Sequence, residues 1–400
     1  MNITLIAGAR PNFMKIAPII RAIKSAQSEG KDIQYRLVHT GQHYDKKMSG
    51  DFFEQLGIPE PDTNLECGGG TQAEQTAGIM VKFEQELVAN RPDLVLVVGD
   101  VTSTMACTIT AKKLCVNVAH VEAGIRSGDM TMPEEINRIV TDALCDYYFT
   151  TSEQANRQLK KNGAPDNSIH FVGNTMIDTL FQNEDRLKKP AFWDAFELKR
   201  KEYFLVTLHR PSNVDDPQKL ASIIAAIDEA SMDFPVIFPV HPRTRQIIDK
   251  FKIRDDKMIM IDPQGYLEFI YLVKNAKGII TDSGGITEEA TVLHVPCLTL
   301  RNSTERPETV TLGTNELIGE DLVDFHFFGN TQGILNTRKD RVVRKLMHIP
   351  LIFHIPDQLR INSVFLKILC QLFGSIIISK DENFLENMIA FFIVVPYPKV

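Results

Sequence analysis

Short apolar runs alternate with amphipathic helical segments from Met1 to Gly319, and this alternation limits the fold more than any other feature of the sequence. Thr71–Arg91 is predicted as one of the helices, with Ile79, Phe83 and Leu87 at helical spacing. Apolar strands that alternate with helices indicate parallel sheets covered on both faces, so the sequence predicts an α/β protein. The first strands are expected at Ile3–Ala7, Tyr35–His39, Leu94–Val98, Val116–Val121, Tyr147–Thr150 and Ile169–Val172.

The same pattern starts again in the second half of the chain, which predicts a second parallel-sheet domain. The 400 residues exceed the ~100–200 that are typical of one domain. Asp216 and Pro217 suit an N-cap and a first helical residue, so a helix is expected to begin there. We place an N-terminal domain at 1–172, a C-terminal domain at 173–319 and an atypical segment at 320–400. The second set of strands is expected at Phe204–Thr207, Val236–Pro239, Met258–Ile261, Gly278–Thr281 and Cys297–Leu300.

Composition excludes several classes of protein. The formal net charge of −7 disfavours broad nucleic-acid binding, which needs a basic surface. No run reaches the ~18 apolar residues of a membrane span, and Lys367 and Gln371 interrupt the longest one. The first apolar run lacks the basic segment of a signal peptide, and the six cysteines form no CxxC pair. We therefore expect a cytoplasmic protein with reduced thiols and with neither a nucleic-acid nor a membrane partner.

Two turns between a strand and a helix are candidate anion sites. The first carries Arg10 and Lys15 after Gly8, although a surface turn with solvated charges explains it equally well. It matches neither GxGxxG nor a P-loop. In the second, Ser283, Gly284 and Gly285 precede a helix whose free N–H groups can hold a phosphate. Glu289 lies nearly two helical turns further on, where it could meet ribose hydroxyls; the alternative interpretation of this turn is a helix cap.

Acidic residues and histidines follow several of the predicted strands. Asp100, Glu122 and Glu134 are each explained by a cap or a surface acid, but together they fall on one edge of the first sheet. Clustered carboxylates are expected to raise one another's pKa, which suits general acid–base catalysis. His209 and His241 end two strands of the second domain, each beside an arginine, and are expected to face a ligand.

Ten segments, in order, resemble the non-hydrolysing UDP-N-acetylglucosamine 2-epimerases. Each motif is weak alone, but together they cover the chain from Met1 to about Gly319. The segments are GARPNFMK from Gly8, TGQHYD from Thr40, GDVTST from Gly99, HVEAGIRSGDMTMPEEINR from His120, GNTMID from Gly173, LHRPSN from Leu208, HPRT from His241, DPQGYLEF from Asp262, TDSGGITEEA from Thr281 and TERPE from Thr304.

The resemblance implies two Rossmann-like domains in the GT-B arrangement and the interconversion of UDP-GlcNAc and UDP-N-acetylmannosamine without NAD or metal. The family's route eliminates UDP to leave a 2-acetamidoglucal, and UDP then adds back with the proton on the other face. The resemblance also implies a homodimer, a role in cell-surface polysaccharide biosynthesis, and a second nucleotide-sugar site near Gln42, His43 and His241. The residues expected to line the active site are Arg10, Lys15, Asp100, Glu122, Glu134, His209, Gln264, Ser283, Gly285, Glu289 and Arg306.

Other functions stay open from the sequence. Epimerases of UDP-2,3-diacetamido-glucuronic acid carry much the same motifs. Hydrolysing relatives, which release free ManNAc and UDP, are a less favoured alternative. A GT-B glycosyltransferase would suit the Ser283–Glu289 segment, although it does not explain the three acids of the first domain. The sequence of residues 320–400 departs from the pattern of closing helices that the family implies, so a UDP-sugar-binding protein inactivated by this segment is a further alternative.

Overall fold

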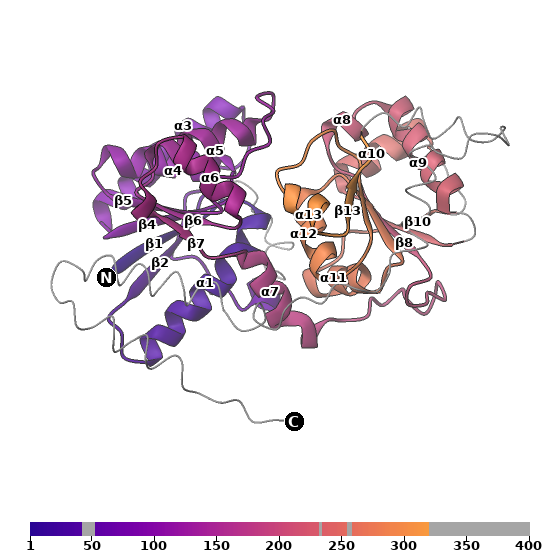
Figure 1. Cartoon of the computed structure of the whole chain (residues 1–400), viewed down its shortest axis with the longest axis horizontal. Helices are drawn as coiled ribbons and strands as arrows, with labels where there is room; N and C mark the ends of the chain where they lie inside the picture. Colours follow the sequence, from indigo (N-terminus) through magenta and orange to yellow (C-terminus); the bar gives the residue numbers. More distant parts are fainter. Residues whose placement is uncertain (42–52, 232–233, 254–257, 320–400) are drawn as a thin grey trace.

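The computed structural model describes residues 1–41, 53–231, 234–253 and 258–319, and two sheets organise this part of the chain (Figure 1). The first sheet is parallel throughout, with the strand order β3-β2-β1-β4-β5-β6-β7. Its strands are β1 (Asn2–Ala7), β2 (Gln34–His39), β3 (Thr63–Asn64), β4 (Leu94–Val98), β5 (Asn117–Val121), β6 (Tyr147–Thr150) and β7 (Ile169–Phe171).

Helices cover both faces of this sheet, as the continuous burial of its strands requires. On one face, Phe13, Ile16 and Ile20 of α1 pack on Leu5 and Leu96. The other face is covered mainly by α3 and α4. The helices of this domain are α1 (Arg10–Ser28), α3 (Gln72–Ala89), α4 (Thr102–Lys113), α5 (Pro133–Leu144) and α6 (Glu153–Lys161).

The second sheet is also parallel and has the order β10-β9-β8-β11-β12-β13. Val206, Phe238 and Ile280 lie in one core, and Leu205, Ile237 and Ile279 lie in the core on the opposite face. The strands are β8 (Phe204–Thr207), β9 (Val236–Pro239), β10 (Met258–Ile261), β11 (Gly278–Thr281), β12 (Cys297–Thr299) and β13 (Asn315–Leu317). The helices are α8 (Pro211–Val214), α9 (Pro217–Ser231), α10 (Pro242–Phe251), α11 (Tyr266–Asn275), α12 (Gly284–Val292) and α13 (Pro307–Thr311).

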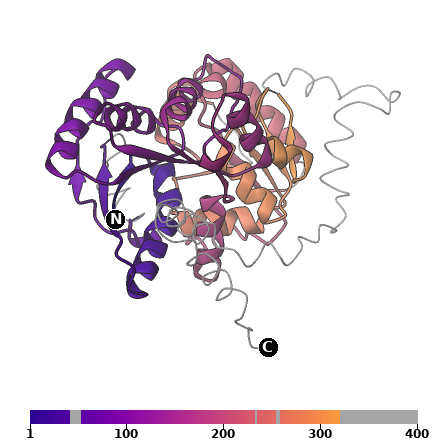
Figure 2. The same ribbon diagram turned by 60° about the vertical axis from the view of Figure 1, so that its left-hand side comes forward.

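The predicted α/β class and the two parallel-sheet domains are confirmed, and the domains face each other in the GT-B arrangement (Figures 1 and 2). Every predicted strand is present within one residue at each end. Strands β3 and β13 were not predicted, because these short edge strands, with the sequences TN and NEL, lack the apolar run that marks the others. The predicted cap at Asp216 is also present, since its Oδ1 accepts from the N–H of Gln218 (2.9 Å).

Helix α7 (Thr175–Asn183) follows the last strand of the first sheet and contacts both domains. Its Leu180 packs in the core of the first domain with Phe13, and Thr179 Oγ1 donates to the carbonyl of Met14 (2.6 Å). The helix also contacts α12 of the second domain. The division at residue 173 therefore stays a prediction, because α7 belongs to the contact between the domains.

Among the described residues, no helix is both long and apolar enough to cross a membrane. The segment 320–400, which the sequence marks as atypical, lies outside the described residues.

Ile20→Ala tests the packing of α1 on the first sheet. Ile20 is 1% exposed, so the substitution leaves a cavity and should lower the free energy of unfolding by about 2–5 kcal/mol. Urea denaturation followed by circular dichroism measures the change. Lys24→Ala, at an exposed position of the same helix, should have little effect. Equal effects of the two substitutions would contradict this account of the core.

Candidate functional site

The candidate site lies where the strand order reverses in each sheet. In the first sheet, β1 and β4 are neighbours, and the connections that leave them run in opposite directions. In the second sheet, β8 and β11 have the same relation. Ligands of open α/β sheets bind outside the carboxyl ends of the strands at such a point. Gly8 and Asp100 follow the first pair of strands, and His209 and Asp282 follow the second pair.

A cavity of about 1150 Å³ opens between these two edges and is lined by both domains. It is large enough for a nucleotide sugar. The side chain of Arg10 and residues Gln42 and His43 lie outside what the structure describes, so their predicted places are not tested. The other predicted site residues all line this one cavity: Lys15, Asp100, Glu122, Glu134, His209, His241, Gln264, Ser283, Gly284, Gly285, Glu289 and Arg306.

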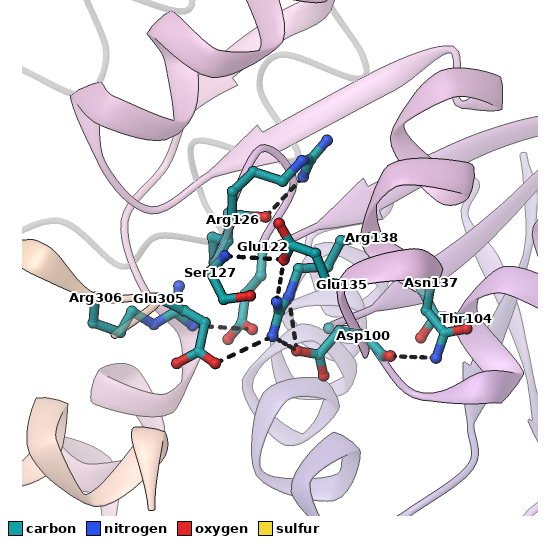
Figure 3. A network of polar contacts seen from close by, with 12 residues as sticks. Asp100, Thr104, Glu122, Arg126, Ser127, Glu135, Asn137, Arg138, Glu305 and Arg306 are labelled. Carbon is teal, nitrogen blue, oxygen red and sulfur yellow. Dashed lines mark hydrogen bonds and ion pairs between the residues drawn. The ribbon is translucent and has the colours of Figure 1, made fainter. Parts of the chain in front are cut away.

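Buried charges meet across the domain boundary at the floor of this cavity. Lys15 Nζ donates to Glu122 Oε2 (2.6 Å), and Arg306 Nη2 of the second domain lies 3.2 Å from the same oxygen. Arg306 Nε lies 2.9 Å from Glu288 Oε1. All four side chains are at most 9% exposed. We name Lys15, Glu122, Arg306 and Glu288 the buried charge cluster; Figure 3 shows Arg306 and Glu122 side by side.

Glu122 has a strained backbone within this cluster. Its φ is +72°, in the left-handed region that residues with a Cβ rarely adopt. Such a conformation persists only where surrounding contacts hold it, and these are common at functional sites. The contacts to Lys15 and Arg306 supply that constraint. Glu122 Oε1, by contrast, is buried without a hydrogen-bond partner in the described part of the chain, so it can accept from a ligand.

A second ion-pair network surrounds Asp100 (Figure 3). Arg138 donates to Asp100 Oδ2 through Nε (3.0 Å) and Nη2 (2.7 Å), and its Nη1 donates to Glu135 Oε2 (2.6 Å). Glu305 of the second domain is held by two hydrogen bonds from Arg301 and lies 3.7 Å from Arg138. Asp100 keeps 32% of its side chain exposed to the cavity, so it can reach a ligand while Arg138 holds it.

The prediction that the acids of the first domain raise one another's pKa holds only in part: Asp100 raises the pKa of Glu122, but nearby cations leave both pKa values below their ordinary values. Partial burial raises the pKa of Asp100, but the charges of Arg138 and Lys15 outweigh it and hold the pKa below its ordinary value. Burial likewise raises the pKa of Glu122, and Lys15 and Arg306 together bring it below its ordinary value. Both pKa values therefore lie below the predicted ones because Lys15, Arg138 and Arg306, from three separate chain segments, surround the two acids. Both groups are therefore ionised at neutral pH, which is the form of a carboxyl group that can accept a proton.

The acids with a raised pKa lie instead in the second domain, on α12. Burial raises the pKa of Glu289 to about 8, and the neighbouring Glu288 adds to the rise. Burial also raises the pKa of Glu288, although Arg306 opposes the effect. The sequence pattern predicts a site role for Glu289 but not for Glu288. Adjacent residues of a helix point about 100° apart, and here α12 is enclosed enough to bury both.

His209 is held by Asp282, a residue that the sequence marks only as part of the motif beginning at Thr281. The His209 Nδ1 lies 2.8 Å from Asp282 Oδ1, which orients the ring and leaves Nε2 for a ligand. Asp282 is fully buried and also accepts from the backbone N–H groups of His209 and Arg210. Its position at the end of β11 is the same signal that drew attention to the other strand-end acids.

The Ser283–Gly285 turn begins α12 beside Asp282. Ser283 stands at the N-cap but makes no capping hydrogen bond with its side chain, which weakens the interpretation of this turn as a simple helix cap. A Cβ at Gly285 would lie 3.2 Å from Met176 Cε, a tight contact with the flexible end of a side chain of α7. His241 is the N-cap of α10 and Gln264 Nε2 donates to the carbonyl of Asp262 (2.7 Å), so both have local roles in addition to lining the cavity.

The raised pKa of Glu289 predicts a stability that falls as pH rises. The ordinary pKa is 4.5 and the folded value is about 8, so the folded protein binds this proton more tightly. The stabilisation is complete below pH 4.5 and is lost as pH rises through about 8. Glu289→Gln cannot ionise, so its free energy of unfolding should not show this loss. The free energy of unfolding of the variant minus that of the natural chain should therefore be more positive at about pH 8 than at about pH 5, by more than about 1 kcal/mol. Urea denaturation at both pH values measures this; the exposed Glu84→Gln is the control, and parallel pH profiles for Glu289→Gln and the natural chain would contradict it.

Comparison with known proteins identifies the family. The model of the UDP-N-acetylglucosamine 2-epimerase family matches residues 25–325. A UDP-N-acetylglucosamine 2-epimerase of Methanocaldococcus jannaschii is 44% identical over 332 residues, which cover 80% of this chain and 89% of the relative. A UDP-2,3-diacetamido-2,3-dideoxy-D-glucuronate 2-epimerase of Pseudomonas aeruginosa is 42% identical over 325 residues, 80% of this chain and 88% of the relative.

The three-dimensional structure agrees with this assignment. A crystal structure of the Methanocaldococcus jannaschii UDP-GlcNAc 2-epimerase in complex with UDP-GlcNAc and UDP superposes with a TM-score of 0.74 and 41% identity. The match covers 87% of this chain and 99% of the other. The resemblance seen in the sequence motifs is thereby confirmed, and the chain belongs to the UDP-N-acetylglucosamine 2-epimerase family.

Proposed function

We propose that this chain interconverts UDP-GlcNAc and UDP-N-acetylmannosamine by reversible inversion at C2 of the sugar. The observation that carries the proposal is the shared cavity: ionised acids of the first domain face the Ser283–Gly285 turn of the second across one space. The relatives of the same family and the UDP-GlcNAc complex of the Methanocaldococcus jannaschii enzyme support the choice of substrate.

The chemistry requires help at two places on the sugar. The C2 proton of a pyranose is not acidic until the C1–O bond to UDP begins to break. A base then takes the proton, the C2–H electron pair forms the C1=C2 double bond, and UDP leaves as the diphosphate. Return of UDP to C1, with a proton delivered to the opposite face of C2, completes the inversion. One group must therefore accept a proton and another must supply one.

The residues of the cavity suit these two tasks. Asp100, Glu122 and Glu134 are proposed as the acid–base groups for the two faces of C2, and Asp100 and Glu122, whose pKa values are lowered, begin as carboxylates that can accept the proton. His209, oriented by Asp282, and the N–H groups that begin α12 are proposed to stabilise the leaving diphosphate. Arg10 and Lys15 are proposed to contribute positive charge there, and Gln264, Glu289 and Arg306 to line the nucleotide. No metal or nicotinamide enters this proposal.

The Pseudomonas aeruginosa relative keeps a second substrate open. Its identity of 42% is close to that of the Methanocaldococcus jannaschii enzyme, and the matched lengths are similar. UDP-2,3-diacetamido-glucuronic acid is therefore the alternative substrate. Incubation of the full-length chain with each UDP-sugar, followed by NMR of the products, separates the two candidates. Absence of turnover with both would favour a UDP-sugar-binding protein.

We further propose that the protein is a cytoplasmic homodimer. The described cysteines are free thiols, which supports a reducing compartment. The outer surface of α3 and α5 supports self-association, because both helices expose apolar side chains. Helix α4 contacts both of them and so holds them in one layer. Ile136 and Ile139 of α5 are 45% and 37% exposed, and Val81 and Val88 of α3 are 57% and 72% exposed. The inward side of α5 carries Glu135 and Arg138, so self-association would also steady the site.

Asp100→Asn tests the acid–base role. In D2O, the natural chain should place deuterium at C2 of UDP-GlcNAc, and the variant should lose this exchange by at least roughly 100-fold, because the amide cannot accept the proton. NMR of the sugar measures the incorporation. Asp146→Asn is a matched control, because Asp146 is 31% exposed, pairs with Lys112 and lies away from the cavity. Full exchange in Asp100→Asn would remove Asp100 from the mechanism.

Ile139→Lys tests the self-association surface. A charge at the centre of an apolar interface is costly to desolvate, so the variant should be monomeric at concentrations where the natural chain is dimeric. Analytical ultracentrifugation measures the mass. Phe251→Lys replaces an apolar residue of α10 that is 49% exposed, and it should leave the dimer intact. A natural chain that sediments as a monomer would refute the homodimer itself.

A further inference from the structure

Glu288 has a role in the structure that the proposed chemistry does not use. Its Oε1 accepts from Asn174 Nδ2 (2.7 Å) and lies 2.9 Å from Arg306 Nε. One buried carboxylate oxygen therefore joins two groups that come from different segments of the chain. Asn174 is the N-cap of α7, and Arg306 precedes α13.

Asn174 links this carboxylate to the first domain. It follows Gly173, whose φ is +91°, at the point where the chain leaves the first sheet for α7. The Asn174 Oδ1 accepts from the N–H of Met176 (2.9 Å), so both polar atoms of this side chain, Oδ1 and Nδ2, are hydrogen-bonded. Further along α7, Thr179 Oγ1 donates to the carbonyl of Met14 on α1. Met14 is the neighbour of Lys15, which belongs to the buried charge cluster.

These contacts close a ring around the domain junction. From Lys15 the ring passes to Glu122, then to Arg306 and Glu288, then to Asn174, and returns through α7 and α1 to Lys15. Two of its links cross the predicted division at residue 173, namely Arg306 to Glu122 and Thr179 to Met14, while Glu288 to Asn174 joins α12 to the start of α7. We call the segment at Gly173 and Asn174, where the chain leaves the first sheet for α7, the interdomain crossover. The position of Glu122 thus depends on Arg306 of the second domain and, through Glu288, on this crossover.

We propose that Glu288 is a positioning residue: it holds Arg306 against Glu122 and ties both to the interdomain crossover at Asn174. The inference rests on the proposed function in that Glu122 is taken as an acid–base group. Removal of Glu288 frees Arg306 to swing and frees the crossover from α12, so the carboxylate of Glu122 loses its fixed place. Arg306 is also proposed to line the nucleotide, but the contacts of the Ser283–Gly285 turn do not pass through this ring and should be kept, so substrate binding should change less than kcat.

Glu288→Ala in the full-length chain tests the proposal. We expect kcat for UDP-GlcNAc to fall roughly 10- to 100-fold, as for a small misplacement of a reacting group, while KM changes less than about threefold. Glu288→Gln keeps an oxygen for Asn174 and Arg306 and should recover most of the lost kcat. Glu86→Ala is the matched control: Glu86 is also nearly buried (10% exposed), pairs with Arg36 at 2.6 Å, and lies away from the cavity. It should leave kcat unchanged.

Several outcomes would overturn the proposal. An unchanged kcat in Glu288→Ala would do so, and so would a raised KM with normal kcat, which would make Glu288 a substrate ligand. Equal loss in the alanine and glutamine variants would show that the charge matters rather than the contact. If Glu288→Ala does not fold, Asn174→Ala breaks the ring at its other end, and a normal kcat there overturns the proposal.

A separate readout distinguishes this inference from the proposed function. If the natural chain does not turn over UDP-GlcNAc, the proposed function fails while the ring can still be tested. Small-angle scattering with UDP present should then give a larger radius of gyration for Glu288→Ala than for the natural chain, because the domains are less firmly held. Identical scattering curves would refute the ring.

Discussion

The carboxylate of Glu122, held between Lys15 of its own domain and Arg306 of the other, is the interaction on which the site depends. A buried charge is costly to desolvate unless it is paired and hydrogen-bonded. Neither domain alone supplies the full set of partners. The acid–base role of Glu122 therefore depends on how the two domains are placed, because their separation would leave Glu122 with one cation instead of two.

This dependence explains why the chemistry sits at the edges of two sheets. Parallel strands bring their carboxyl ends to one edge, and the reversal of strand order opens space between the outgoing connections. Asp100 uses that space in the first domain, and His209 and Asp282 use it in the second. Two such edges facing each other enclose a volume that one sheet could not. Glu122 directly follows β5 at this edge, and its backbone has a φ of +72° there. At this position both Lys15 and Arg306 reach its side chain.

The two domains also differ in the electrostatic environment they provide. Cations surround the acids of the first domain, so Asp100 and Glu122 keep their charge despite burial. On α12 of the second domain, burial outweighs the nearby cation, and Glu288 and Glu289 bind protons more tightly than usual. The cavity therefore holds carboxylates able to accept a proton beside carboxylic acids able to keep one, and this pairing comes from packing rather than from residue type.

The sequence by itself determined the strands, their parallel pairing and the strand ends that carry reactive side chains. It could do so because strand burial leaves a continuous apolar run and because chain order decides which ends share an edge. Asp100, Glu122, His209 and Ser283 were found in this way, and they meet in one cavity. Only the tertiary structure decided which acids are ionised and which residues hold them. Those properties depend on Arg138, Arg306 and Asp282, which reach Asp100, Glu122 and His209, respectively, only when α5, β11 and the Arg306 segment are packed together. A pKa depends on the nearest charges in space, and no local pattern of residues records charges that arrive from the other domain.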